Sequence, residues 1–409
     1  MALPATPKVE IRFGIGAGFG NVFVLGSSTD GILGTNVFGS QNTQVVEITD
    51  TVTRISTRRG RDRVFNTFNP GSASIQFIDL TGDFNPDNAA GPYYGQIVPM
   101  CQVRCSATYS GNAYYLFTGY VTAWDWTWDT GAEFGRVTIS AVDGFHALNL
   151  LDIDSVPAGT AGQYTGQRID DLLDAAVWPS TLRNISTGTV TCQADPGGAR
   201  VALGACQLIE ATETGAFYMD GTGNATFLDH DDLGLLSNGT ATVFDDDGTD
   251  IQYQTIDVSL DETELANVVT VTREGGTPQT VSDATSIETY YRRNYGRSGL
   301  MMETDSQALA QANYLLTYKK NATLRIDSIG LDLSSPSNRV AAGLQLDIGD
   351  PVVINRHYAG TTITADLAVQ GMSHDISPDR WFTTISTAER VTAFILGSAT
   401  SGILGTSRF

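Results

Sequence analysis

The sequence offers few clusters of side chains that could perform chemistry. Its histidines, the usual general bases and metal ligands, are scattered along the chain at His146, His230, His357 and His374. It has no HExxH zinc motif, no GxSxG nucleophile elbow, no P-loop lysine and no GxGxxG loop that opens a helix after a strand. A conventional hydrolase or nucleotide-dependent enzyme is therefore disfavoured, and we expect no catalytic residue, no metal and no cofactor.

Two acidic runs are the nearest approach to a metal site. The run from Asp245 to Asp250 resembles a calcium loop, but aligning its glycine with the EF-hand glycine places Val243 and Gln254 where acidic ligands are needed. We interpret this run, and the shorter one from Asp229 to Asp232, as solvated turns. The basic run Arg58–Arg63 is interpreted in the same way, as an exposed loop or a partner for acidic neighbours.

The four cysteines are Cys101, Cys105, Cys192 and Cys206. The first two share one face of an expected strand, but no second pair or clustered histidine completes a tetrahedral metal site. We expect buried free thiols. A disulfide between Cys192 and Cys206 is compatible with the sequence but is not required by it.

Three tryptophans are the most distinctive candidate binding residues. Trp124, Trp126 and Trp128 alternate with Asp125 and Thr127, so strand geometry places the three indoles on one face. If exposed, this row could stack on sugars or on a partner; if buried, it forms part of a core. We favour a core or a subunit interface over a carbohydrate platform.

A near-repeat occurs at the two ends of the chain. Residues 23–35 and 394–406 match at ten of thirteen positions, and nothing similar lies between them. Either both copies pack on the same small domain, or both are docking arms that contact neighbouring subunits. In the second interpretation glycines supply the bends, and the apolar side chains anchor the arms: Phe23, Leu25, Ile32, Leu33, Phe394, Leu396, Ile403 and Leu404.

Composition narrows the class of protein. A chain of 409 residues with 41% hydrophobic residues and 43 glycines is long enough for two to four folded domains, at roughly 100–200 residues per domain. The net charge of −21 makes sequence-specific DNA binding a poor interpretation. No signal-peptide pattern and no run near the ~20 apolar residues of a membrane helix occurs, so we expect synthesis in the cytoplasm and no membrane insertion.

The pattern of elements predicts a β-rich α+β multidomain protein with two β-barrel, tube-like domains. We expect an extended N-terminal arm over 1–40, a first β-barrel over 41–150 and a small inserted α+β module over 151–255. A second β-barrel, carrying one helix across it, is expected over 256–392, followed by a C-terminal arm over 393–409. In the module, the spacing predicts helices over 165–178 and around 206–214, and then a β-hairpin.

Several of these stretches resemble phage tail hub proteins. The run from Gly343 to Glu389 is similar to the closing barrel of this group, and the stretches 117–124, 137–144 and 61–86 are similar to its first barrel. The group includes the contractile-tail baseplate hub and the N-terminal part of siphophage tail-associated proteins. The two terminal repeats resemble the ends of minor tail proteins from phages of actinobacteria.

This resemblance implies a non-enzymatic structural protein of the virion, located at the tail tip. It implies a homotrimer whose two barrels per subunit form a pseudo-sixfold ring. Such a ring joins the tail tube and distal-tail protein to the central-fibre or tape-measure protein, and genomic DNA passes through its channel without binding. No long C-terminal extension follows the second barrel, so we expect any lysin or spike function on another chain.

Three alternatives remain open. The chain could be a hexameric distal-tail adaptor, which would have one barrel per subunit and an appended module. It could be a receptor- or carbohydrate-binding tip protein that uses the tryptophan face. A cell-wall hydrolase with an unfamiliar carboxylate pair is the weakest alternative.

Overall fold

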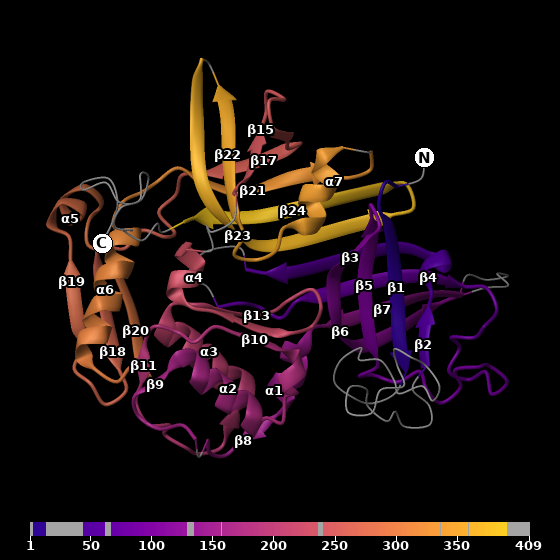
Figure 1. Ribbon diagram of the computed structural model, residues 1–409, viewed down its shortest axis with the longest axis horizontal. Helices are drawn as coiled ribbons and strands as arrows, with labels where there is room; N and C mark the ends of the chain where they lie inside the picture. The colour runs from indigo at the N-terminus through magenta and orange to yellow at the C-terminus, as the bar shows by residue number, and fades with distance from the viewer. Residues whose placement is uncertain are drawn as a thin grey trace.

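The structure is a computed structural model. It describes residues 3–13, 44–61, 67–128, 135–156, 158–235, 240–335, 337–358 and 360–390. Strands dominate these residues, and most of the helices are gathered in two places, while α7 lies apart from them beside the large sheet (Figure 1). The expected β-rich α+β fold class is confirmed. Within the described residues, no helix is long and apolar enough to cross a membrane.

A 14-stranded sheet forms the largest part of the molecule. Its strands from the first part of the chain are β1 (Thr6–Phe13), β2 (Gln44–Glu47), β3 (Val52–Gly60), β4 (Ser72–Asp79), β5 (Gln102–Tyr109), β6 (Asn112–Thr127) and β7 (Gly135–Val142). Those from the last part are β15 (Thr242–Asp245), β16 (Ile251–Gln252), β17 (Thr255–Ser259), β21 (Arg325–Asp332), β22 (Pro351–Tyr358), β23 (Thr361–Ser377) and β24 (Arg380–Glu389). Strict alternation specifies many of them: in β4, Ala73, Ile75 and Phe77 are buried while the residues between them face outward.

The strands of the two expected barrel regions join in this one sheet. The main strand order is β16-β15-β22-β23-β3-β4-β7-β6-β5-β1-β2, and β24, β21 and β17 continue from the other edge of β23. The junction is the antiparallel pairing of β3 with β23, from Gly60 opposite Gly371 to Ile55 opposite Ile376. Along one edge, the 17-residue strand β23 pairs first with β22 and then with β3, so it belongs to both regions.

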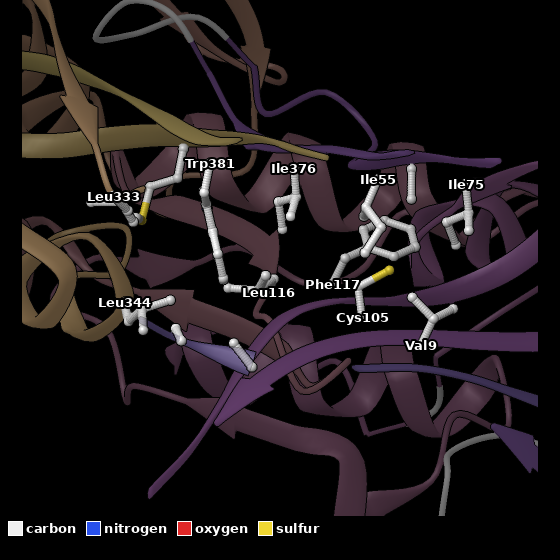
Figure 2. Close-up of a cluster of buried hydrophobic side chains, with 14 of the residues drawn as sticks. Val9, Ile55, Ile75, Cys105, Leu116, Phe117, Leu333, Leu344, Ile376 and Trp381 are labelled. Carbon is white, nitrogen blue, oxygen red and sulfur yellow. The ribbon is translucent and has the colours of Figure 1, made fainter. Parts of the chain in front are cut away.

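A single hydrophobic core follows the sheet through this junction. It runs from Ile75 in the first region, past Ile55 and Ile376 at the junction, to Trp381 and Leu333 in the last region (Figure 2). The short helix α7 (Asn338–Gln345) contributes to the same core. Burial of apolar side chains is the main favourable term in folding. Because strands from the first and the last part of the chain share this core, the two regions stabilise each other.

The expectation of an extended arm over residues 1–40 is wrong for its beginning. Thr6–Phe13 is a strand that pairs with β5 on one edge and with β2 on the other. Val9, Ile11 and Phe13 are fully buried. The apolar alternation of this segment therefore places it in the core, whereas residues 14–43, including the first repeat, lie outside the described part of the chain.

A helical module follows β7 and has its own core. Its elements are α1 (Gly144–Leu150), β8 (Asp152–Ile153), β9 (Gln163–Tyr164), α2 (Thr165–Ala175), β10 (Arg183–Ile185), β11 (Thr191–Cys192), β12 (Arg200–Val201), α3 (Ala202–Glu213), β13 (Ala216–Met219), β14 (Ala225–Leu228) and α4 (His230–Leu235). The predicted helices and the predicted hairpin correspond to α2, α3 and the antiparallel pair β13–β14. Two short 3₁₀ helices lie at Thr49–Thr51, before β3, and at Ser180–Leu182 in this module.

A smaller sheet with one long helix completes the described chain. It consists of β18 (Val268–Arg273), β19 (Gln279–Ser282) and β20 (Asn294–Leu300), with α5 (Ala284–Tyr290) and α6 (Asp305–Lys319). The predicted helix near residue 304 is α6, which begins with a capping box between Thr304 and Gln307. The expectation that it lies across a second barrel is wrong. Its apolar face, including Ala308 and Leu315, packs on this three-stranded sheet in a third core.

Candidate functional site

The three tryptophans on β6 differ in exposure. Trp124 is 9% exposed and Trp126 is half-buried, and their rings stack at a centroid distance of 6.4 Å. Trp128, just past the strand, is 57% exposed and lies over Gly135, where an added Cβ would come within 2.7 Å of the indole nitrogen. Trp124 and Trp126 thus share one face of β6, and Trp128 is the most exposed of the three.

The chain itself covers the other two indoles. The segment between β4 and β5 crosses this face, and Phe84 from that segment stacks on Trp124 at 6.4 Å. The indole nitrogen of Trp126 donates to the Phe84 carbonyl at 2.8 Å, and that of Trp124 donates to the Val98 carbonyl at 3.2 Å. Both indole donors are satisfied internally, as buried tryptophan requires.

An aspartate fixes the start of this covering segment. The Asp79 carboxylate, at the end of β4, accepts hydrogen bonds from the backbone amides of Gly82, Asp83 and Phe84 at 2.9–3.1 Å. It therefore places Phe84 over the tryptophan face. A sugar could reach Trp124 and Trp126 only if this segment moved away, so the geometry favours a core role for both.

The other candidate interface residues lie outside the described residues. These are Phe23, Leu25, Ile32, Leu33, Phe394, Leu396, Ile403 and Leu404. The structure does define where each repeat-bearing segment joins the fold. The first connects Phe13 to Gln44, which are directly opposed in the β1–β2 pair. The second follows Arg390, at the end of β24. Both segments therefore join strands of the large sheet.

The basic run at Arg58–Arg63 contains two buried residues, so the interpretation as an exposed loop is wrong for them, whereas pairing with an acidic neighbour is found for Arg59. Arg59 and Arg61 are 6% and 5% exposed, not loop residues in solvent. Arg59 donates from Nε to the Leu116 carbonyl at 2.8 Å and forms an ion pair with Asp347 at 3.0 Å. It thereby joins β3, β6 and the segment before β22. Arg59 lies on β3 and Arg61 follows its last residue, and the even spacing of the two arginines was the available signal.

Arg61 lies at the meeting point of the large sheet, the helical module and the smaller sheet. Its Nε donates to the Gln370 side chain at 2.9 Å, and its guanidinium lies 4.4 Å from the centre of the Phe68 ring. Burial lowers its pKa to about 10. Arg61 also lines a cavity of about 310 Å³ together with Glu210 on α3 and Arg297 on β20.

The carboxyl group of Glu210, which lines this cavity, has a raised pKa. Its side chain is fully buried, and burial raises its pKa to about 8 against the opposing effect of Arg61. Its Oε2 atom is buried without a hydrogen-bond partner in the described structure. No second carboxylate lines the cavity among the described residues, whereas glycoside hydrolysis ordinarily uses two. The arrangement therefore gives no support to the hydrolase alternative.

The acidic run at Asp245–Asp250 is a turn held by its own hydrogen bonds. The Asp245 carboxylate accepts from the backbone amides of Gly248 and Asp250. The adjacent Asp246 accepts from His357 Nδ1 on β22 at 2.8 Å, and this hydrogen bond raises the pKa of the histidine. Among the described residues, no group of three or more potential metal ligands comes together. The turn thus holds the end of β22 that lies nearest the tip of the β22–β23 hairpin.

The four cysteines are buried free thiols, as predicted. Burial raises the pKa of Cys105 and of Cys206 to about 12 and that of Cys192 to about 11, so all three stay protonated at neutral pH. Cys192 and Cys206 do not form a disulfide. Protonated, buried thiols are poor nucleophiles and poor metal ligands, so they act as small apolar side chains.

Comparison with known proteins is informative at the level of structure. No family model matches the sequence, and no curated protein matches it. The structure is similar to a tail protein from Neisseria meningitidis MC58, with a TM-score of 0.56 and 14% identity over 94% of this chain and 96% of that one. It is also similar to the 43 kDa tail protein of prophage MuSo2 from Shewanella oneidensis, with a TM-score of 0.53 and 13% identity.

These likenesses extend over nearly the whole chain. The second covers 85% of this chain and 96% of the prophage protein. At such low identity the likeness establishes the fold. The resemblance that the sequence motifs indicated is thereby confirmed in structure: this chain has the β-rich fold of phage tail proteins.

Proposed function

We propose that this chain is a non-enzymatic structural hub of a phage tail tip. It assembles as a homotrimer whose subunits each contribute two barrel-like halves to a pseudo-sixfold ring. The ring joins the tail tube and the distal-tail protein to the central-fibre or tape-measure protein and lines the DNA exit channel. Its net charge of −21 is compatible with a channel through which DNA slides without sticking.

The observation that carries this proposal is the continuity of the large sheet. One chain contains two groups of strands joined side by side at β3 and β23, which is the relationship that neighbouring halves of a ring would repeat. Among the described residues, β2 lies at one limit of the sheet, and β16 and β17 lie at the others. Unpaired strand edges favour association, and head-to-tail association that closes on itself removes them.

The two terminal repeats fit the same scheme. The first is carried by the connection between β1 and β2 at one end of the strand order, and the second follows β24 in the opposite half. In a closed ring, the two ends of one subunit face different neighbours. We therefore propose that the repeats act as docking arms between subunits, with their leucines and isoleucines as anchors.

The experiment that tests the hub is measurement of particle mass in solution by light scattering, with electron microscopy of the protein alone and bound to tail-tube protein. A threefold ring with a central hole is the expected result. A sixfold ring would transfer the function to a distal-tail adaptor. A protein that stays monomeric alone and with these partners would overturn both assignments.

A further inference from the structure

One exposed aromatic residue has a backbone conformation that residues with side chains rarely adopt. Tyr291 directly follows α5, with a φ of +61° and a ψ of 170°. This region is essentially restricted to glycine, because a Cβ atom is crowded by the neighbouring backbone. The side chain of Tyr291 is 84% exposed, so it makes little contact that could offset the strain. The fold therefore holds a tyrosine in water where glycine would be less strained.

A buried asparagine fixes this conformation. Asn267, just before β18, is fully buried. Its Nδ2 atom donates to the Tyr291 carbonyl at 2.7 Å, and its Oδ1 atom accepts from the Arg293 amide at 2.8 Å. Its backbone amide donates to the Arg293 carbonyl at 3.0 Å, and its carbonyl accepts from the Asp283 amide at 3.1 Å. All four polar groups of this asparagine thus bind the segment that carries α5 and Tyr291, so the exposed position is built into the fold.

The residue next to Tyr291 adds a positive charge. Arg292 is exposed, and its Nε atom donates to the Asn294 side chain at 3.2 Å. Among the described residues, no carboxylate forms an ion pair with Arg292, whereas the adjacent Arg293 pairs with Glu262. The charged group directly beside Tyr291 is therefore a cation that can meet the carboxylate of a partner, in a chain whose net charge is −21.

This surface lies apart from the edges of the large sheet. Figure 1 shows α5 at the left end of the molecule, away from both β2 and β17. The smaller sheet that carries α5 contributes no strand to the large sheet. If subunits associate through the edges of the large sheet, Tyr291 and Arg292 lie outside that contact and are left for a different protein.

We propose that Tyr291 and Arg292 form the centre of a docking surface for a different protein of the tail. This partner has an apolar recess that receives the tyrosine ring and a carboxylate at the rim that pairs with the arginine. The inference rests on the proposed function for the identity of the particle. Tyrosine and arginine are enriched among the residues that dominate the binding energy of interfaces. A side chain already held outward loses less conformational freedom on docking, and a guanidinium can bind a carboxylate through two parallel hydrogen bonds.

The melting temperature of the full-length subunit tests whether the strain serves display. Tyr291→Gly should raise it by about 1–3 °C, because glycine adopts this conformation without strain. Tyr358→Gly is the matched control: this tyrosine is 69% exposed but lies in β22 without a positive φ, so glycine should lower the melting temperature. A lower melting temperature for Tyr291→Gly would show that the tyrosine stabilises its own subunit, and would overturn the proposal.

Photo-cross-linking in the assembled tail tests the docking itself. The photoreactive amino acid p-benzoylphenylalanine replaces Tyr291, purified tails are irradiated, and mass spectrometry maps the products. We expect a covalent product with a different tail protein, at a peptide in which apolar residues adjoin aspartate or glutamate. Arg292→Glu should reduce its yield at least about 10-fold, and Arg292→Lys should reduce it less because the charge is kept. The same photoreactive group at position 358 should not give this product.

Three results would overturn the docking surface: a product with a second copy of this chain, a product with DNA, or no product with another chain. Light scattering of the purified subunit, measured in parallel, separates this inference from the hub. Rings that form normally in the absence of the cross-link would overturn the docking surface alone. A natural subunit that never forms rings would count against the hub alone, because the cross-link is a separate measurement.

Discussion

Gly60 and Gly371 lie opposite each other where β3 meets β23, and neither strand could approach so closely with a side chain at position 60. A Cβ on Gly60 would lie 2.3 Å from the Gln370 carbonyl oxygen and 2.4 Å from the Gly371 Cα atom. Gly60 also has a φ of +96°, which L-residues with side chains rarely adopt. This pair therefore sets the geometry at which the two halves of the large sheet join.

Substitution of Gly60 should weaken the whole fold. Gly60→Ala is expected to lower the free energy of unfolding by about 2–5 kcal/mol, because the unfavourable φ and the backbone clash both act at this position. Gly111→Ala is the matched control, since Gly111 has a φ of +83° and open space around it; it should cost only about 1–2 kcal/mol. Urea denaturation measures both, and equal losses would show that close approach at the junction is unimportant.

Replacing Trp124 and Trp128 one at a time should show which of the two side chains stabilises the core. Trp124→Ala is expected to lower the free energy of unfolding by about 3–5 kcal/mol, because it empties a space beneath Phe84. Trp128→Ala should change it by less than about 1 kcal/mol, since that side chain is mostly exposed. Thermal and urea denaturation provide the comparison. Loss of glycan or cell-wall binding by a stably folded Trp124→Ala variant would instead restore the carbohydrate interpretation.

Glu210 should make the protein less stable as the pH rises from about 4.5 to about 8. Its pKa is about 8 in the folded state against 4.5 for an ordinary glutamate, so its protonated form is favoured by folding. The contribution is fully present below pH 4.5 and is lost as the pH rises to about 8, with a slope approaching about 1.4 kcal/mol per pH unit. Glu210→Gln should remove this slope.

Urea midpoints measured from pH 5 to pH 9 test this dependence. The stability advantage of Glu210→Gln over the natural protein should grow between pH 5 and pH 8 and then level off. Glu288→Gln, on the exposed face of α5, is the matched control and should run parallel to the natural protein. A Glu210→Gln curve that is also parallel would mean that the carboxyl is already ionised at pH 5.

Excision of the first repeat should weaken ring assembly without lowering the stability of the subunit. Phe13 and Gln44 are opposed in the β1–β2 pair, so a short glycine-containing turn can replace residues 14–43 and keep both strands. The melting temperature should change little, whereas light scattering should show weaker ring assembly if the repeat docks on a neighbour. Deletion of residues 1–36 would be a poor test, because it also removes the buried strand β1. Normal assembly of the excised protein would contradict the docking-arm proposal.

Local patterns predicted the elements that depend on neighbouring residues. The capping box of α6, the apolar spacing of α2 and the β13–β14 hairpin are all specified within a dozen residues. The strand β1 was missed because the glycines of residues 14–40 dominated the composition of its region. Its own sequence, from Thr6 to Phe13, alternates like other strands of the sheet.

Long-range relationships could not be obtained in this way. The tryptophan row was predicted to share one face, but its cover by Phe84 depends on the path of a turn-rich segment that no local pattern specifies. Arg59 and Arg61 appeared to be loop residues because their buried partners, Leu116 and Gln370, are distant in the sequence. The sequence of α6 predicts its apolar face but does not specify which sheet that face packs on.

The pairing of β3 with β23 also has a consequence during synthesis. The two strands are about 310 residues apart, so β3 has no partner on that edge until nearly the whole chain has left the ribosome. During that interval the first half presents an open strand edge beside a half-covered core, a state prone to aggregation. Truncated translation products should therefore be insoluble, and soluble protein should accumulate only once the region encoding β23 has been translated.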